Sequence, residues 1–384
     1  MERARPVVVA GAGMAGLTMA LELARRDIAS IVVERAPRLE EVGAGLQLSP
    51  NALRVLARLG RLDDLKARGT VAETVTLRRG DTGRPIASVP VAADDGTPYL
   101  SIHRADLQAW LADAVAASPL VDLRLGTGIT GVTQHGGGIR TDISAAGGDG
   151  SLHAPLLIAA DGVNSPISRM LGLGEAVATG ALAWRGRIAD LSALPPPAGI
   201  EAWLGPRRHA VAYPIAGGRE TNLVLIEPAT DMTDAADLAR RFDRWDRRLG
   251  AMIAAVGSFT AWPLKGVPPQ RSWRHLDDRL ILIGDAAHGM LPYAAQGAAM
   301  AIEDAAVLAD HLDRAPSLPA ALRGYEAERR PRIDRVRARV AFHRRVYHLP
   351  FPLSLARNAV LARRSPDSLA RDLAWLYDWY PPRG

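Results

Sequence analysis

The feature that most constrains this chain is a glycine-rich turn near its start. Residues 7–10 form a short β-branched apolar run, which predicts a buried parallel strand. Residues 11–16, GAGMAG, follow directly and lead into a helical pattern that reaches about residue 26. Residues 31–33 predict a second strand, which ends at Glu34. A strand, a turn, a helix and a second strand in this order predict an α/β fold with a parallel sheet.

Each part of this turn suits a dinucleotide. Gly11 and Gly13 permit a tight turn and a close approach of the backbone to a pyrophosphate, and Gly16 permits close packing of the helix on the strand. The pyrophosphate would lie at the N-terminus of the helix, beside Ala15. Glu34 can accept hydrogen bonds from ribose hydroxyls, which favours FAD or NAD over NADP at this site.

A later stretch predicts a second ligand-facing site. A buried strand at residues 280–283 is followed by Asp285, whose carboxylate can accept a hydrogen bond from a sugar-like hydroxyl. The loop that follows contains Pro292 and Gln296, and a long apolar helix begins near Gly297. The N-terminus of such a helix offers free N–H groups and a partial positive charge. FAD, with its ribitol and its reducible ring, has a polyol next to a group that becomes negative and therefore fits.

Three further segments could face the same ligand. A buried apolar run ends in Asp161, and the alternative for this position is a plain turn. Arg104 and Gln108 share one face of a predicted helix, and the alternative is a solvated pair. Gln47 ends a glycine-rich loop, residues 41–47, which either passes close to the ligand or only connects two elements.

Residues 177–266 have a different character, because strand patterns dominate there. This segment predicts a largely antiparallel sheet inserted into the nucleotide-binding domain. Alternation places His209, Val211 and Tyr213 on one face of a strand. The two ionisable groups could form an acid/base pair, and the alternative is that both are core or rim residues. Farther on, Pro331 is expected to break the arginine-rich helix of the C-terminal region.

Composition narrows the class of protein. The 384 residues suffice for about two domains. The absence of cysteine excludes disulfides, thiolate metal sites and cysteine nucleophiles, and it makes the cytoplasm the expected compartment. Among the expected site residues we assign none to a metal. The net charge of +6 indicates either a solvated basic surface or attraction for anionic ligands. We expect no nucleic acid partner, because no pattern of that class occurs, and no stable membrane insertion, because no long uncharged apolar run occurs.

Three separated motifs stand in order in the chain: GAGMAG with Glu34, IAADGVNSPISRM, and LILIGDAAHGMLPYAAQGAAMAIEDA. Together they resemble the single-component FAD-dependent aromatic hydroxylases, the group A flavoprotein monooxygenases related to p-hydroxybenzoate hydroxylase. The similarity is closest to the salicylate hydroxylase, 3-hydroxybenzoate 6-hydroxylase and 6-hydroxynicotinate 3-monooxygenase branch. The segments GAGLQLSPNALRVLARLG and HRADLQAWL and the tail WLYDWYPP add to it, so the resemblance covers nearly the whole chain.

The resemblance implies a fold and its division. We expect a Rossmann-like FAD-binding domain of the GR2 type, with an inserted, mainly antiparallel substrate-binding sheet and a C-terminal helical region. The expected FAD-binding domain comprises residues 1–72, 98–176 and 267–330. The expected substrate-binding sheet comprises residues 73–97 and 177–266, and residues 331–384 form the helical region.

The resemblance also implies roles for matching positions. Glu34 and Arg35 would hold the adenosine, Asp285 would bind the ribitol, and the N–H groups of Gly297 and Ala298 would meet the N1–C2=O edge of the flavin. Arg104 and Gln108 would reach the pyrophosphate and ribose, and Asp161 lies in a motif that serves both FAD and the pyridine nucleotide. The expected cofactor-binding residues are Gly11, Gly13, Ala15, Gly16, Glu34, Arg35, Gln47, Arg104, Gln108, Ile129, Asp161, Asp285, Gly297 and Ala298.

The implied reaction uses NADH or NADPH, which binds transiently and reduces FAD. The reduced flavin reacts with O₂ to a C4a-hydroperoxide, which hydroxylates a small phenolic or hydroxypyridine ring that carries a carboxylate. Ionising a phenol with a pKa near 10 needs a base, and His209 and Tyr213 resemble the paired residues of the 3-hydroxybenzoate-like branch. Pro292 and Gln296 would border flavin and substrate, Tyr213 and Pro292 would contact the substrate, and Arg185 is a candidate partner for the carboxylate.

Three alternatives remain open at the level of the sequence. The substrate could be a ubiquinone precursor or another lipophilic ring, since the C-terminal region is both arginine-rich and apolar. A flavin-dependent halogenase would require a WxWxIP segment, which the sequence lacks. The chain could also bind flavin without hydroxylase activity. A homodimer is compatible with the sequence but is not indicated by any motif.

Overall fold

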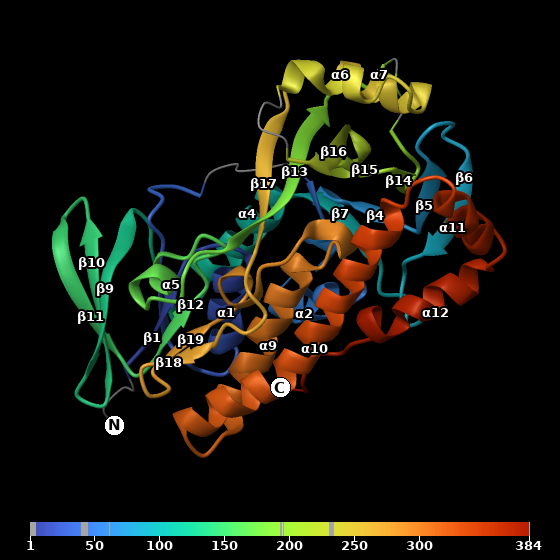
Figure 1. Ribbon diagram of the computed structural model, residues 1–384. Helices are drawn as coiled ribbons and strands as arrows, with labels where there is room; N and C mark the ends of the chain where they lie inside the picture. Colours follow the sequence, from blue (N-terminus) through green and yellow to red (C-terminus); the bar gives the residue numbers. More distant parts are fainter. Residues whose placement is uncertain are drawn as a thin grey trace.

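Two large sheets form the framework of the chain (Figure 1). The computed structural model describes residues 5–39, 45–60, 62–192, 194, 196–229 and 234–383. Most of the predicted glycine-rich loop at 41–47 therefore lies outside the described residues. Within the described part, the chain is mixed α/β, with helices over both large sheets and a C-terminal helical region, in agreement with the predicted fold class.

The first sheet has six strands in the order β18-β19-β12-β1-β2-β8. Its strands are β1 (Val7–Ala10), β2 (Ser30–Val33), β8 (Val121–Arg124), β12 (Leu157–Ala159), β18 (Arg274–His275) and β19 (Leu280–Leu282). All neighbours are parallel except the β18–β19 pair at one edge. The β1 residues are all buried, which is why a parallel strand reads as a continuous apolar run.

Parallel pairing decides where the ligand-facing residues lie. Because β1, β2, β12 and β19 run in the same direction, their carboxyl ends meet at one edge of the sheet. The glycine turn, Glu34, Asp161 and Asp285 each follow one of these four strands and therefore lie along this edge. Ligands of open α/β sheets bind at the carboxyl edge of the strands.

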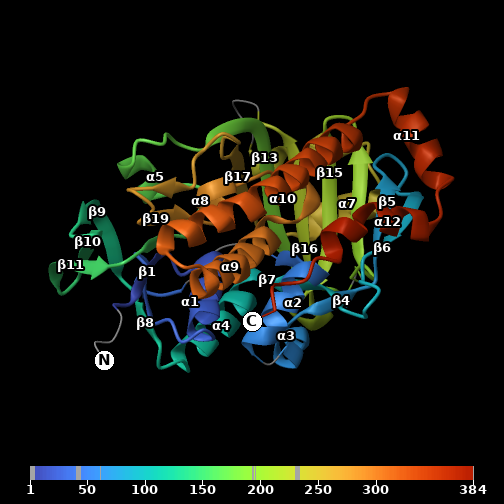
Figure 2. The same cartoon turned by 90° about the horizontal axis from the view of Figure 1, so that it is seen from below.

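Helices cover the first sheet. They are α1 (Met14–Ala24), α2 (Pro50–Leu59), α3 (Leu62–Arg68), α4 (Arg104–Ala116), α5 (Pro166–Met170), α8 (Asp285–His288) and α9 (Gly297–Arg314). In α1, every residue from Met14 to Leu23 is buried, because this helix packs between the sheet and both α4 and α9 (Figure 2). Burial on all sides explains why α1 has an apolar composition rather than an amphipathic one.

The second sheet has seven strands in the order β17-β13-β16-β15-β14-β5-β6. Its strands are β5 (Thr74–Arg79), β6 (Pro85–Pro90), β13 (Val177–Ile188), β14 (Ile200–Gly205), β15 (Arg208–Ile215), β16 (Glu220–Pro228) and β17 (Thr260–Gly266). All pairs are antiparallel except β14 with β5. Helices α6 (Leu238–Arg241) and α7 (Arg247–Ala255) cover its outer face, where Trp184, Ala210 and Ala212 are buried with them.

Two three-stranded sheets complete the β structure of the described residues. One contains β3 (Gly45–Leu48), β7 (Tyr99–His103) and β4 (Thr70–Ala72), and the other contains β9 (Thr127–His135), β10 (Gly138–Ala145) and β11 (Gly148–Ala154). The second of them projects from the end of the first large sheet (Figure 1). Short 3₁₀ turns lie at η1 (Ala216–Gly218), η2 (Ala235–Asp237) and η3 (Pro292–Ala294).

The C-terminal region consists of α10 (Leu318–Tyr347), α11 (Leu353–Ala362) and α12 (Pro366–Tyr377). The prediction that Pro331 breaks this helix is wrong, since α10 runs through it. A proline removes only one backbone donor, and here buried contacts of Arg329, Ile333 and Val336 on either side hold α10 in place. Helices α11 and α12 pack against β6 (Figure 2). Among the described residues, no helix is both long and apolar enough to span a bilayer.

Candidate functional site

The glycine turn has one side filled by protein and one side open. A Cβ on Gly11, which has φ +98°, would lie 2.7 Å from the carbonyl oxygen of Ala160, and a Cβ on Gly16 would lie 1.8 Å from that of Gly11. A Cβ on Gly13 would meet no atom within 4 Å. Helix α1 has neither a side-chain cap nor an acidic residue in its first turn. Its N-terminal N–H groups therefore remain available to an anion, such as the pyrophosphate of a dinucleotide.

Two predicted residues converge on this turn. One carboxylate oxygen of Glu34 accepts a hydrogen bond from the N–H of Ala12, at 2.9 Å, and the other accepts from the N–H of Ala36, also at 2.9 Å. The amide Nε2 of Gln108 donates to the carbonyl oxygen of Ala12, at 2.9 Å. The structure thus brings Glu34 and Gln108 together at the end of β1. Arg104 is half-buried at the start of the same helix as Gln108, and Arg35 is exposed beside Glu34.

Asp161 has one oxygen that the protein does not satisfy. Its Oδ2 accepts from the N–H of Ile167 at 3.1 Å, while its Oδ1 is buried and has no hydrogen-bond partner among the described residues. Burial raises the pKa of Asp161, and the nearby Arg35 opposes this effect. A buried acceptor without a partner is costly, so this oxygen suits a donor from a bound ligand.

The segment after β19 offers an acid next to a helix N-terminus. Asp285 is exposed although its neighbours Gly284 and Ala286 are buried. A Cβ on Gly297 would lie 3.9 Å from Oδ1 of Asp285, so this carboxylate lies beside the start of α9. Helix α9 has 18 residues, no side-chain cap and no acid in its first turn. The free N–H groups at Gly297 and Ala298 and the adjacent acid fit an anionic ring edge next to a polyol.

Together these residues fit FAD. Glu34, the open side of the turn, the unpartnered oxygen of Asp161 and Asp285 with the start of α9 follow the sheet edge in the strand order β2, β1, β12 and β19, which is the order that an adenosine, a pyrophosphate, a ribitol and a flavin ring would require. Ile129 lies in β9, which contacts the end of β2 near the adenosine side, and is half-buried there. No other feature of Ile129 in the structure bears on its expected role in cofactor binding.

Gln296, which the resemblance places beside flavin and substrate, directly precedes Gly297 at the start of α9. It is 1% exposed, and its Nε2 donates to Oγ of Ser49 at 3.0 Å while its Oε1 accepts from Nδ2 of Asn51 at 3.3 Å. Asn51 also donates to Glu303 at 2.6 Å. The side chain of Gln296 therefore belongs to a buried polar network and is not part of the cavity lining described next.

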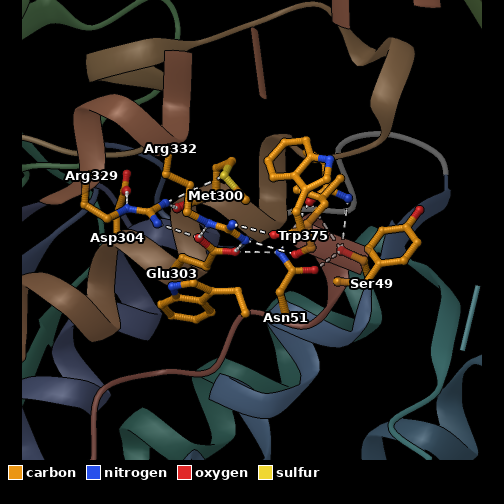
Figure 3. Close-up of polar contacts among 12 residues, drawn as sticks. Ser49, Asn51, Met300, Glu303, Asp304, Arg329, Arg332 and Trp375 are labelled. Atoms are coloured by element: carbon orange, nitrogen blue, oxygen red, sulfur yellow. Dashed lines mark hydrogen bonds and ion pairs between the residues drawn. The ribbon is translucent and has the colours of Figure 1, made fainter. Parts of the chain in front are cut away.

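Figure 3 shows the remainder of this network. Glu303 of α9 lies between Asn51 on one side and two arginines of α10, Arg329 and Arg332, on the other. Arg329 also donates to Asp304 at 2.8 Å. Glu303, Asp304 and Arg329 are at most 1% exposed, and each charge is matched by an opposite one. The network fixes α9 against α2 and α10 directly behind Gln296 and Gly297.

A cavity of about 570 Å³ lies between the second sheet, the loop at η3 and helices α10 to α12. Its lining includes His209, Pro292 and Tyr293, and also Gln47, which the sequence assigned to the cofactor. The Oε1 of Gln47 accepts from the hydroxyl of Tyr99 at 3.0 Å. The cavity thus joins the strand that carries His209 to the loop that leads into α9.

His209 is buried in a group of aromatic side chains. Its Nδ1 lies 2.9 Å from Nε2 of His348, and its ring centroid lies 5.1 Å from that of Tyr293 and 5.6 Å from that of Tyr347. Burial, together with His348 and His343, lowers the pKa of His209 well below its usual value. The imidazole is therefore neutral near pH 7. Its Nε2 has no hydrogen-bond partner among the described residues.

The two other histidines of this group come from the end of α10 and escaped the sequence analysis. His343 hydrogen-bonds through Nδ1 to the carbonyl oxygen of Tyr293 at 3.0 Å. Burial lowers the pKa of His343 to about 4 and that of His348 to about 4. His348 is 139 positions from His209 in the chain, and no spacing rule links residues so far apart.

His209 and Tyr213 share a sheet face, as alternation predicts, and only His209 of the two lines the cavity. Val211 between them lines the cavity, whereas Tyr213 does not. Four residues of extended chain separate the two Cα atoms by roughly 13 Å, and the described residues show no direct contact between their side chains. Burial raises the pKa of Tyr213, and Arg185 opposes this effect. Tyr213 is therefore under the electrostatic influence of Arg185.

Arg185 is a half-buried cation without a carboxylate partner among the described residues. Its Nε is buried and makes no hydrogen bond there, and its guanidinium carbon lies 5.5 Å from the ring centroid of Trp262. Burial lowers the pKa of Arg185, Tyr213 raises it, and Arg104 lowers it further. An anionic ligand at the guanidinium of Arg185 would offset the cost of burying its charge.

Comparison with known proteins places these features in context. The model of the FAD binding domain family matches residues 4–340. The chain is 36% identical to 3-amino-4-hydroxybenzoate 2-monooxygenase of Streptomyces cremeus, over 97% of this chain and 94% of that protein. It is 33% identical to 3-hydroxybenzoate 6-hydroxylase 1 of Aquipseudomonas alcaligenes, over 97% of both. The structure of Klebsiella pneumoniae HpxO complexed with FAD and uric acid aligns with a TM-score of 0.86 and 24% identity, over 100% of this chain and 99% of that one.

Proposed function

This chain belongs to the FAD binding domain family, among the flavin-dependent aromatic-ring hydroxylases, and we propose that its substrate is a small phenol or hydroxypyridine that carries a carboxylate. Both curated relatives are named for rings that bear a hydroxyl and a carboxylate. The observation that carries the proposal is His209, a buried imidazole that is held by His348 in a cavity bordered by Pro292.

The cofactor has a defined place in this proposal. Bound FAD would accept hydride from NADH or NADPH and would activate O₂ for transfer of one oxygen atom to the ring. The chain supplies the surroundings. The N-terminus of α9 favours negative charge on the flavin. Pro292 and Tyr293 line the cavity in the loop before α9, so that a ring bound there would lie against the flavin.

His209 is proposed to hold and remove the proton of the substrate hydroxyl. Its Nε2 is without a protein partner among the described residues, and a neutral imidazole can accept a proton there. Its Nδ1 is hydrogen-bonded to Nε2 of His348, which is less deeply buried. When Nε2 of His209 takes the substrate proton, the proton on Nδ1 could pass through His348 towards the surface. Removing the proton makes the ring electron-rich when oxygen is transferred.

Arg185 is proposed as the partner of the carboxylate. The arginines in the cavity lining, which are Arg339, Arg357 and Arg364, already bond to protein groups. Arg185 lies outside that lining, two strands from the lining residue Val211 in the sheet, and has no such partner among the described residues. A substrate carboxylate at this guanidinium would offset the cost of burying the charge. Tyr213, next to Arg185, is then proposed to contact the same end of the substrate.

The proposal is tested with a panel of hydroxybenzoates and hydroxypyridines and the FAD-loaded protein. We expect at least one member to accelerate NADH or NADPH oxidation and to yield a hydroxylated product. Acceleration only by prenylated phenols would favour the lipophilic-ring alternative. Oxidation that yields peroxide alone with every compound would favour a flavin-binding protein without hydroxylase activity.

A further inference from the structure

The cavity is larger than the substrate ring requires. Its volume is about 570 Å³. A hydroxybenzoate has about ten non-hydrogen atoms, and at the roughly 30 Å³ that a water-sized group occupies in a liquid, it fills ~300 Å³. About half of the cavity therefore remains after a ring has been placed beside His209.

The remaining space lies between the second sheet and the C-terminal helices, and we name it the apolar arm. It is lined by Leu77, Leu204, Val346, Leu353, Ala356 and Val360. Leu77 and Leu204 form a small buried cluster on the sheet. Leu353 and Val360 of α11 line the arm although they are 55% and 60% exposed. The arm therefore reaches solvent along α11, at the periphery of the molecule (Figure 2).

The charged side chains around the arm are already bonded within the protein. Arg339 donates to the carbonyl oxygen of Asp372. Arg357 donates to the carbonyl oxygens at the end of α10, at 2.9 Å from that of Val346. Arg364 pairs with the carboxylate of Asp372. The arm thus offers mainly aliphatic surface, and the guanidinium groups in its surroundings already donate to protein oxygens among the described residues, which suits an apolar group better than a charged one.

We propose that the aromatic substrate carries an apolar extension, an alkyl chain or a second ring, that lies in the apolar arm. This inference rests on the proposed function, because it places the reacting ring beside His209 and Pro292. Each methylene removed from water into such a site strengthens binding about threefold to fourfold. A simple hydroxybenzoate is then only a partial occupant of the cavity.

Binding and turnover are measured with the FAD-loaded protein and a series of hydroxybenzoates that carry straight alkyl chains from methyl to hexyl, at each open ring position. For one position, calorimetry should show a Kd that falls about threefold with each methylene, and a heat-capacity change that becomes more negative along the series. The kcat/KM for hydroxylation should rise in the same order.

A matched pair of variants locates the effect. Ala356→Trp fills the arm from α11, whereas Ala362→Trp adds the same side chain to the same helix outside the cavity lining. We expect the dependence on chain length to disappear in A356W and to persist in A362W. Thermal unfolding of both variants verifies that each is folded.

The outcomes separate the two proposals. If the Kd is constant or rises with chain length while the unsubstituted ring is hydroxylated, the apolar arm has no role and the proposed function stands. If the Kd still falls with chain length in A356W, the proposal that the extension lies in the apolar arm is wrong and the proposed function stands. If the Kd falls with chain length but no compound is hydroxylated, the ligand class stands and the proposed function fails.

Discussion

At the scale of single residues, the site depends on side chains whose partners are missing or unusual. His209 has a histidine as its hydrogen-bond partner, Asp161 has an unpartnered oxygen, and Arg185 has no acid among the described residues. Structural side chains are normally satisfied when buried. Other buried polar atoms among the described residues also lack a partner, but these three groups lie at the strand end, the sheet face and the cavity where cofactor and substrate would supply one.

His209→Gln should slow ring hydroxylation more than flavin reduction. Glutamine can still donate and accept hydrogen bonds but cannot take the phenolic proton, and loss of a positioned base costs about 10²-fold or more. Stopped-flow absorbance of the flavin separates the two steps. An equal loss in the rates of both steps would show that His209 only supports the fold of the cavity. His348→Gln serves as a comparison variant: it should change the pH dependence of hydroxylation more than the maximal rate.

Arg185→Met should raise the KM of a carboxylated substrate. It should leave unchanged the KM of the same ring without its carboxylate. Loss of a charge-assisted hydrogen bond costs about 2 kcal/mol, or about thirtyfold in kcat/KM. Steady-state kinetics with a hydroxybenzoate and the matching phenol give the comparison. Equal effects on both substrates, or release of FAD, would assign Arg185 to the cofactor instead.

At the scale of elements, the N-terminus of α9 is held by the network around Glu303. Asn51 of α2 links Gln296, the residue before α9, to this glutamate, and Arg329 and Arg332 bind it from α10. The sequence shows the glycine at the start of α9 but not this support, because its members come from three separate segments. For the same reason the sequence does not show that Gln296 hydrogen-bonds to Ser49 and Asn51.

Asn51→Leu should weaken both folding and FAD binding. The change removes the two buried hydrogen bonds that Asn51 donates to Glu303 and Gln296, which costs about 1–3 kcal/mol, although Glu303 keeps its bonds from the two arginines of α10. One of the two lost hydrogen bonds holds Gln296, the residue before Gly297. Urea unfolding and titration of the apoprotein with FAD measure the two effects. Unchanged FAD affinity in a destabilised variant would mean that the network supports the fold without positioning α9.

The histidine group at the end of α10 should make stability depend on pH. The pKa values of His343 and His348 are lowered to about 4, and that of His209 is lowered as well, all by burial. The unfolded chain therefore binds protons first as the pH falls. Stability should be full above about pH 6.5, the ordinary histidine pKa, and should decline from there towards pH 4. Melting curves of H343Q should show a smaller decline, and an identical decline would contradict this origin.

At the scale of the whole molecule, the cofactor edge could be predicted from the sequence and the cavity could not. Gly11, Glu34, Asp161 and Asp285 each stand at the end of an apolar run, and parallel pairing alone brings such ends together. His348 and the apolar arm depend on how α10 to α12 fold back onto the second sheet. Amphipathic periodicity shows that these helices pack, but not against which surface.

The central claim is that this chain inserts one oxygen atom from O₂ into an aromatic ring. The most direct measurement is mass spectrometry of the product formed from the best hydroxybenzoate of the panel, with FAD, NADH or NADPH, and oxygen-18 gas. We predict a hydroxylated product that contains one oxygen-18 atom for each NAD(P)H consumed. Consumption of NAD(P)H with labelled peroxide and no labelled product, across the whole panel, would contradict the account.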